Sequence, residues 1–347
     1  MTSISGISLS ELEKLLSPLP RFRAQQIYKW IIKGVNTYEE MSNIPVVLQN
    51  ELKNKYTLYS SNIQSRHSDT NTEKIVITLK DGLKIEAVLL NDKKNRLTAC
   101  LSTQVGCPCG CLFCKTGSMK LSRNLDSDEI VEQFLHLKNI AEKEKKDGHI
   151  IDNIVIMGMG EPLLNLDNLR KAIDIFSDTK GLNLSKRRIT ISTCGICEGL
   201  FEIANNNPNL RLALSLTTAD ESLRLKLMPI SKTNPLKSVK DALKLYQKNG
   251  GSRITLEIPL LGGINTGKKD ASEIAGFAKG LETVINLIPW NPVKDLEFEG
   301  NPLREPSKEE IYNFKDMLES HKLKVTMRLH KGKKINGACG QLGSTAS

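Results

Sequence analysis

The sequence predicts an α/β protein built on a partial barrel of parallel strands, preceded by a small helical and hairpin unit. From residue 97 onward, apolar strand-like runs alternate with longer helix-like runs. Such alternation is typical of a parallel sheet with helices packed outside it. About six or seven strand–helix units fit a whole or partial barrel better than an open sheet.

The predicted strands share a high content of β-branched residues and leucine, and the predicted helices carry apolar residues at helical spacing. The strand-like runs are 97–103, 153–159, 187–193, 210–216, 253–260, 284–290 and 323–329. The helix-like runs between them include 127–146, 165–178, 236–249, 270–282 and 307–320. We therefore assign residues 93–330 to the barrel and residues 331–347 to a C-terminal basic tail.

Residues 1–92 have a different pattern and form the predicted N-terminal domain. The segments 9–16 and 22–32 read as short helices, and 74–91 reads as two strands around the Asp81–Gly82 turn. We expect Phe22, Tyr28 and Trp30 to be the core of this unit, and RNA contact through this region is the alternative.

Composition places the chain among globular proteins with a polyanionic partner. The 347 residues are 39% hydrophobic and 25% charged, and 49 Lys and Arg against 39 Asp and Glu give a net charge of +10. This excess favours a partner such as nucleic acid. No apolar run approaches the roughly 18 residues of a membrane helix. The first residues lack a secretory pattern, so we expect no membrane association and a cytoplasmic location.

The C-terminal segment is strongly basic. Residues 321–347 contain six Lys and Arg and no acidic residue. On charge alone, a solvated mobile tail and a phosphate-binding segment are equally good interpretations.

Five of the eight cysteines lie between Cys100 and Cys114, which indicates metal or thiol chemistry rather than structural disulfides. Cys107, Cys111 and Cys114 have the spacing C-x3-C-x2-C, and three thiolates converging from a short loop suit a 4Fe–4S cluster. The missing fourth ligand would leave one iron open to a substrate. Structural zinc, with Cys109 as a fourth ligand, is the alternative, but it lacks the usual second distant pair.

Small and polar residues follow several predicted strands, where a parallel barrel places its active site. They are Gly160 and Glu161, Ser192, the run Ser215, Leu216 and Thr217, and Asn291. Their shared position predicts a single polar ligand at this end of the barrel.

Several motifs together resemble the RlmN/Cfr family of radical S-adenosylmethionine RNA methyltransferases, and its RlmN branch in particular. They are the C-x3-C-x2-C loop with Phe113 before the last cysteine, CLSTQVGC at 100–107, RNL at 123–125, MGMGEPLLN at 157–165, LSKRRITIST at 184–193, MPI at 228–230, INLIPWNP at 285–292 and ACGQL at 338–342. The match runs in order from the N-terminal unit to the tail.

The resemblance implies a role for each of these sites. Cys107, Cys111 and Cys114 would bind the cluster, and the residues that follow the strands, from Gly160 to Asn291, would bind S-adenosylmethionine. Glu161 would accept hydrogen bonds from the ammonium group of that cofactor, and Gly160 would let the backbone approach it closely.

The resemblance also implies a methyl relay through two further cysteines. Cys339 would take a methyl group from one S-adenosylmethionine, and a radical derived from a second molecule would activate that methyl group for addition to adenine. Cys100 would resolve the adduct and leave a Cys100–Cys339 disulfide, and Glu86 would be the acid–base residue. Without the resemblance, we would expect Cys100 to be a small buried apolar residue, Cys339 to have no function and Glu86 to be exposed to solvent.

Three departures from the family pattern bear on the substrate. Thr217 stands where the family usually has histidine, Cys109 is an additional thiol in the loop, and residues 333–337 are basic rather than acidic. Cys194 and Cys197 match no catalytic position, so we assign them structural roles, with Cys194 close enough to Ser192 to lie near the ligand.

The resemblance implies methylation of C2 of an adenosine in 23S rRNA, with tRNA as a second candidate substrate. It also implies an electron donor such as flavodoxin or ferredoxin, and we expect a monomer. The alternatives are a radical enzyme that modifies C8 of adenine or a different RNA, and a zinc-stabilised RNA-binding protein without catalysis.

Overall fold

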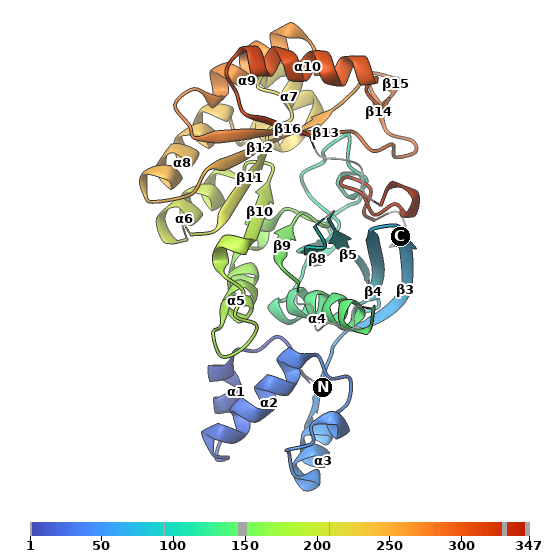
Figure 1. Ribbon diagram of the computed structural model, residues 1–347, viewed down its shortest axis with the longest axis vertical. Helices are drawn as coiled ribbons and strands as arrows, with labels where there is room; N and C mark the ends of the chain where they lie inside the picture. The colour runs from blue at the N-terminus through green and yellow to red at the C-terminus, as the bar shows by residue number, and fades with distance from the viewer. Residues whose placement is uncertain (1, 93, 145–150, 208, 328–331, 344–347) are drawn as a thin grey trace.

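The computed structural model describes residues 2–92, 94–144, 151–207, 209–327 and 332–343. A ten-stranded sheet runs through the molecule in the order β16-β13-β12-β11-β10-β9-β6-β5-β4-β3. The two outer strands of this sheet are not paired with each other, so the barrel is open (Figure 1). The α/β class and the partial barrel predicted from the sequence are both confirmed.

Seven strands of this sheet are parallel to one another and form the barrel wall. They are β6 (Leu97–Cys100), β9 (Asn153–Ile156), β10 (Ile189–Thr193), β11 (Arg211–Ser215), β12 (Ile254–Leu260), β13 (Thr283–Pro289) and β16 (Val325–Met327). Each predicted strand run overlaps one of them, and residues 328 and 329 of the last run lie outside the described residues. The register sets Ser215, the last residue of β11, opposite Glu257 in the middle of β12, which brings two polar residues together.

Helices connect these strands on the outside of the wall (Figure 1). They are α4 (Ser127–Glu144), α5 (Leu166–Ser177), α6 (Cys197–Asn206), α7 (Glu221–Leu227), α8 (Leu236–Lys248), α9 (Lys268–Ala278) and α10 (Lys308–Ser320). The sequence analysis did not predict α6 and α7, which are short helices of 10 and 7 residues. In the described part of the chain, each helix is too short or too polar to cross a bilayer.

The N-terminal unit consists of short helices, as predicted, and lies at one end of the molecule (Figure 1). These are α1 (Leu9–Leu15), α2 (Arg21–Lys33) and α3 (Val46–Lys55). Tyr28 is buried in the core, as expected, and Trp30 is half-buried. The prediction for Phe22 is wrong: this side chain is 52% exposed at the first turn of α2, where Arg23 lies over its ring.

The hairpin that follows belongs to the main sheet. Strands β3 (Asn62–Asp69), β4 (Thr72–Thr78) and β5 (Lys84–Asn91) are antiparallel, and β5 pairs with β6. The predicted turn at Asp81–Gly82 connects β4 to β5. The domain boundary at residue 92 stays a prediction, and the hydrogen-bonded sheet is continuous across it. This continuity places Val88 of β5 opposite Cys100 of β6.

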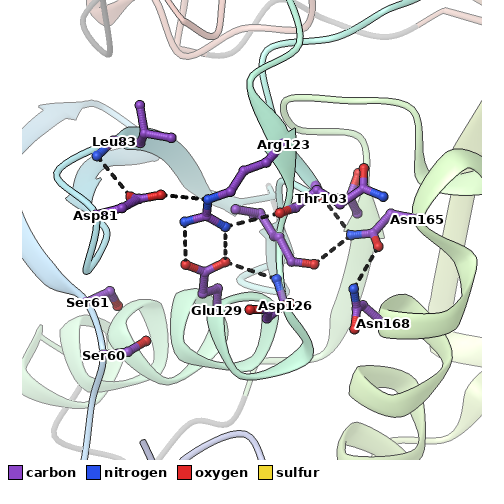
Figure 2. Close-up of polar contacts among 12 residues, drawn as sticks. Ser60, Ser61, Asp81, Leu83, Thr103, Arg123, Asp126, Glu129, Asn165 and Asn168 are labelled. Atoms are coloured by element: carbon purple, nitrogen blue, oxygen red, sulfur yellow. Dashed lines mark hydrogen bonds and ion pairs between the residues drawn. The ribbon is translucent and has the colours of Figure 1, made fainter. Parts of the chain in front are cut away.

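Arg123 ties the hairpin to the barrel. Its guanidinium donates to Asp81 in the β4–β5 turn at 2.6 Å and to both carboxylate oxygens of Glu129 on α4 at 2.7 and 2.8 Å (Figure 2). Nearby, Asn165 donates from Nδ2 to the carbonyls of Thr103 and Leu125 (Figure 2). Polar residues of the RNL and GEPLLN motifs therefore hold the backbone on either side of the cysteine loop.

Candidate active site

The cysteine loop, residues 107–114, is fixed by hydrogen bonds from three directions. Trp290, at the end of β13, donates from its indole N–H to the carbonyl of Phe113 at 2.8 Å. The backbone N–H of Leu112 donates to the carbonyl of Leu227 at the end of α7, 2.9 Å away. The N–H of Lys115 donates to the carbonyl of Gly340 at 2.8 Å. The loop is therefore held by the barrel wall, by α7 and by the C-terminal segment.

Cys107, Cys111 and Cys114 all line one cavity at the carboxyl ends of the strands. Burial raises the pKa of Cys111 well above its usual value, and the nearby thiols of Cys114 and Cys107 raise it further. Burial likewise raises the pKa of Cys114. Three converging thiols of this kind become thiolates only when a cationic centre compensates their charge, as an iron–sulfur core does. The donor set therefore fits a 4Fe–4S cluster.

Glu161 and Gly160 line the same cavity, beyond β9. The Glu161 carboxylate accepts hydrogen bonds from the backbone N–H groups of Leu163 at 3.1 Å and Cys194 at 2.8 Å. Its burial raises its pKa, so an ammonium group bound beside it would regain the charge compensation that water no longer supplies. Gly160 has φ +101°, and a Cβ there would lie 2.6 Å from the Cβ of Gln104.

Ser192 and Ser215 also line the cavity, together with Glu257, which the sequence analysis missed. The Ser192 hydroxyl donates to Glu257 Oε2 at 2.8 Å and lies 3.3 Å from the Ser215 hydroxyl. Glu257 is an acidic residue within the otherwise apolar strand β12 and is 95% buried. An isolated carboxylate in a buried strand was the feature that could have identified it, because such a residue requires a polar partner.

Leu216 and Thr217 follow β11 but are not among the residues that line the cavity. Both are fully buried, and Thr217 has φ +64°. Asn265 donates to the Thr217 carbonyl at 2.9 Å, and the Thr217 hydroxyl has no hydrogen-bond partner among the described residues. At these two positions the structure therefore directs the side chains away from the cavity.

The described part of the C-terminal segment, residues 332–343, is docked and is not a solvated mobile tail, so that interpretation is corrected. Asn291 donates from Nδ2 to the Cys339 carbonyl at 3.0 Å, and Thr116 donates from its hydroxyl to the Leu342 carbonyl at 2.7 Å. Cys339 and Asn291 both line the cavity that contains the cluster-loop thiols. Arg328 and Lys331, two of the basic residues on which the charge argument rested, lie outside the described residues.

Glu86 is fully buried on β5, so the solvated reading of this residue is wrong. Its Oε1 lies 3.5 Å from the Nζ of Lys74 on β4, and its Oε2 accepts a hydrogen bond from the backbone N–H of Gly343 at 3.0 Å. Lys74 in turn donates to the carbonyl of Asn336 at 3.3 Å. The pair therefore holds the docked segment on both sides of Cys339, at Asn336 and Gly343, and Glu86 is not among the cavity-lining residues.

All eight cysteines are described, and none of them forms a disulfide. The expected Cys100–Cys339 disulfide is therefore absent from this structure: Cys100 is a buried thiol on β6 and Cys339 an exposed one. Cys194 lines the cavity, close to the ligand-binding residues as anticipated, and its Sγ lies 3.5 Å from that of Cys109.

Comparison with known proteins decides the family. The Radical SAM superfamily matches residues 101–274, and the ribosomal RNA large subunit methyltransferase N-terminal domain matches residues 3–58. The chain is 49% identical over 347 residues to the probable dual-specificity RNA methyltransferase RlmN of Treponema denticola, covering 100% of this chain and 96% of that protein. This chain belongs to the RlmN family of radical SAM RNA methyltransferases.

Further RlmN relatives and a solved structure agree with this assignment. The RlmN of Treponema pallidum strain Nichols is 42% identical over 345 residues, covering 99% of this chain and 98% of that protein. A radical SAM methyltransferase from Sphaerobacter thermophilus, solved by crystallography, superposes with a TM-score of 0.93 at 33% identity, covering 100% of both chains. The protein is therefore a radical SAM enzyme that methylates RNA and uses a 4Fe–4S cluster and S-adenosylmethionine.

Proposed function

We propose that this RlmN protein methylates C2 of an adenosine in 23S rRNA through an S-methylcysteine on Cys339. The observation that carries the proposal is the shared cavity: the Cys339 segment is docked against the loop that contains Cys107, Cys111 and Cys114. A carrier thiol and a radical-generating centre must lie at one site, because a carbon radical has to form on the carried methyl group. The N-terminal match to a large-subunit ribosomal RNA methyltransferase domain supports the rRNA substrate.

The chemistry of the target explains why this arrangement is needed. C2 of adenine is an electron-poor amidine carbon, so it does not attack a methyl cation equivalent. Bound at this site, a cluster would supply the electron that breaks a carbon–sulfur bond of S-adenosylmethionine, giving methionine and a 5′-deoxyadenosyl radical. We propose that Cys107, Cys111 and Cys114 hold the cluster. Glu161 would orient the ammonium group of S-adenosylmethionine, and the cofactor's other contacts would come from residues at the strand ends: Gly160, Ser192, Ser215, Leu216, Thr217 and Asn291.

We assign the methyl relay to residues of this chain. The Cys339 thiolate would attack the methyl carbon of S-adenosylmethionine, so that the methyl group becomes bound to its sulfur and S-adenosylhomocysteine leaves. Cys100 is the second thiol, which releases the methylated base from Cys339. Glu86 is the acid–base residue that moves the proton at C2, and its hydrogen bond to Gly343 places it beside the segment that carries Cys339. For Leu216 and Thr217, whose side chains lie outside the cavity, the contact would come from the backbone.

We further propose tRNA as a second substrate, since the curated relatives are named dual-specificity RNA methyltransferases. A small electron-transfer protein such as flavodoxin or ferredoxin would supply the electron. We expect the enzyme to act as a monomer in the cytoplasm, where its RNA substrates are found. Modification of C8 of adenine, or of another RNA, is the alternative within the same chemistry.

Mass mapping of methylated adenosines tests the substrate. Ribosomal and transfer RNA from cells with and without this protein would be digested and compared. We expect 2-methyladenosine at one position of 23S rRNA, present only in the cells that contain the protein. Detection of 8-methyladenosine in its place, or of methylated adenosine only in another RNA, would contradict the proposal. Zinc without iron or sulfide in anaerobically purified protein would instead indicate the non-catalytic alternative.

The carrier role of Cys339 has its own test. The Cys339→Ala variant should hold iron and bind S-adenosylmethionine as the wild type does but transfer no methyl group to RNA, because the acceptor thiol is missing. Transfer of a labelled methyl group to RNA under reducing anaerobic conditions is the measurement. Cys197→Ala is the matched control, since Cys197 does not line the cavity, and it should keep full activity. Full methyl transfer by Cys339→Ala would exclude the relay.

A further inference from the structure

Arg224 on α7 is a buried cation at the base of the active site. Its side chain is among the largest that are fully buried in the protein, with a relative exposure of 1%. None of the ion pairs among the described residues includes it. Burial lowers the pKa of its guanidinium. A buried guanidinium without a carboxylate partner is costly, so a residue of this kind requires another source of compensation.

The hydrogen bonds of Arg224 join the ends of two adjacent strands. One terminal nitrogen donates to the carbonyls of Leu216 and Ser215, the latter at 3.2 Å, and the other donates to the carbonyl of Cys194 at 2.5 Å. These carbonyls follow β11 and β10, next to the cavity-lining hydroxyls of Ser215 and Ser192. The planar fork of an arginine can serve several carbonyls at once, which a lysine ammonium cannot do with the same geometry.

The helix that carries Arg224 also holds the cysteine loop. Leu227, at the last turn of α7, accepts the hydrogen bond from Leu112, and the following residue, Met228, lines the cavity. The same nitrogen of Arg224 that serves β11 lies 3.3 Å from the Met228 sulfur. Arg224 therefore connects the cluster loop to the strand ends through one short helix, and its Nε has no partner among the described residues.

We propose that Arg224 is a positioning residue that fixes the carboxyl ends of β10 and β11 and supplies the buried positive charge that balances the cluster. This inference rests on the proposed cluster ligands Cys107, Cys111 and Cys114. Three thiolates more than balance the charge of an oxidised cubane core, and the electron that enters on reduction adds a further negative charge. A fixed cation in a medium of low dielectric stabilises the more negative, reduced state and so raises the reduction potential.

Three variants separate the charge from the hydrogen bonds. Arg224→Met replaces the arginine with an uncharged, unbranched side chain. The reduction potential of the cluster should then become more negative, and KM for S-adenosylmethionine should rise on the order of tenfold. Arg224→Lys keeps the charge but not the fork, so its potential should stay close to that of the wild type while its KM rises. Lys226→Met removes the same charge from an exposed position on the same helix, and it should change neither quantity.

The measurements are an EPR-monitored redox titration of the reconstituted cluster and steady-state kinetics with varied S-adenosylmethionine. Thermal unfolding and iron and sulfide content show whether each variant is folded and loaded. A wild-type potential in Arg224→Met would overturn the charge role. Should Arg224→Met fail to fold or to hold iron, Arg224→Lys decides: a wild-type KM there would overturn the positioning role.

The wild type separates this inference from the proposed function. If the wild-type protein contains no iron and sulfide after anaerobic reconstitution, the cluster ligands are wrongly assigned. That result would overturn both the inference and the proposed function. Loaded wild-type protein, together with an unchanged potential and KM in the Arg224 variants, would overturn the inference and leave the proposed function intact.

Discussion

Single residues in this protein owe their properties to partners that are distant in the sequence. Glu86 reads from its strand as an ordinary surface residue, yet the docked C-terminal segment and Lys74 enclose it completely. Phe22 shows the reverse, since it fits the apolar period of α2 but faces solvent. The buried carboxylate of Glu86 accepts a hydrogen bond from Gly343, and buried Arg224 donates to Cys194 on another strand end, so distant segments help to satisfy both groups.

His136 on α4 predicts how stability depends on pH. It stacks on Tyr59 with ring centroids 4.8 Å apart and lies 3.1 Å from the Ser61 hydroxyl. Burial lowers its pKa from 6.5 to about 4. Between those values the unfolded chain binds a proton that the folded protein does not. The stability that the neutral ring contributes is therefore full above pH 6.5 and is lost as the pH falls toward 4.

The His136→Gln variant tests this prediction. A neutral amide has no proton to bind, so the variant should lose less stability than the wild type over this pH range. The difference should approach ~3 kcal/mol at the acidic end. Urea unfolding at a series of pH values measures it. If the free energy of unfolding fell equally with pH in the two proteins over that range, His136 would not be the cause of the pH dependence.

At the level of elements, the strand-to-helix turns decide which groups reach the cavity. The turn after β9 brings Gly160 against Gln104, and the turn between β4 and β5 places Gly82 in open space. Both glycines have positive φ, +101° and +81°, so both positions disfavour an L side chain. Of these two positions, Gly160 is the one at which a Cβ would also collide with a neighbouring segment.

Alanine at these two glycines should therefore have different effects. Gly82→Ala should cost about 1 kcal/mol of stability and leave the affinity for S-adenosylmethionine unchanged. Gly160→Ala should cost more stability and weaken binding by at least roughly tenfold, because the turn that places Glu161 must shift. Urea unfolding and equilibrium binding to the reconstituted enzyme are the measurements. Equal binding by the two variants would contradict this role of the turn.

At the level of the whole molecule, α4 joins the N-terminal unit to the barrel (Figure 1). Its fully buried Glu132 accepts hydrogen bonds from four serines that flank the N-terminal helices. They are Ser3 at 2.7 Å, Ser5 at 2.8 Å, Ser60 and Ser61, with distances of 2.7 Å to the Ser60 backbone and 2.5 Å to the Ser61 hydroxyl. Lys138 and Asn139 on the same helix donate to the carbonyls of Lys33 and Gly34 at the end of α2.

Glu132→Gln should weaken this connection. One carboxylate oxygen would become an amide donor that faces serine hydroxyls, and a buried mismatch of this kind costs about 2 kcal/mol. We expect a lower urea midpoint and faster proteolysis between residues 3 and 61, with cluster content unchanged in the folded protein. Glu51→Gln, on the exposed surface of α3, should change the free energy of unfolding by less than about 0.5 kcal/mol and leave the midpoint almost unchanged. Equal midpoints for the two variants would argue against Glu132 as the connecting residue.

The sequence by itself determined the parallel barrel, the turn between β4 and β5, the cysteine loop and several of the polar residues that line the cavity. These features depend on local patterns: alternation of apolar runs, an Asp–Gly pair, and the spacing of Cys107, Cys111 and Cys114. Each is encoded within a few consecutive residues, because it follows from backbone geometry or from the reach of a short loop.

Only the tertiary structure decided how distant segments complete the site. It placed Cys339 in the cavity, enclosed Glu86, joined the hairpin to the barrel sheet, and surrounded Arg224 with strand-end carbonyls. It also added Glu257, whose partner Ser192 lies on another strand. These contacts join residues far apart in the chain, and their free energy comes from burial and charge compensation in the folded interior. Local sequence periodicity does not show which distant residues will bury and compensate a polar group in the folded interior.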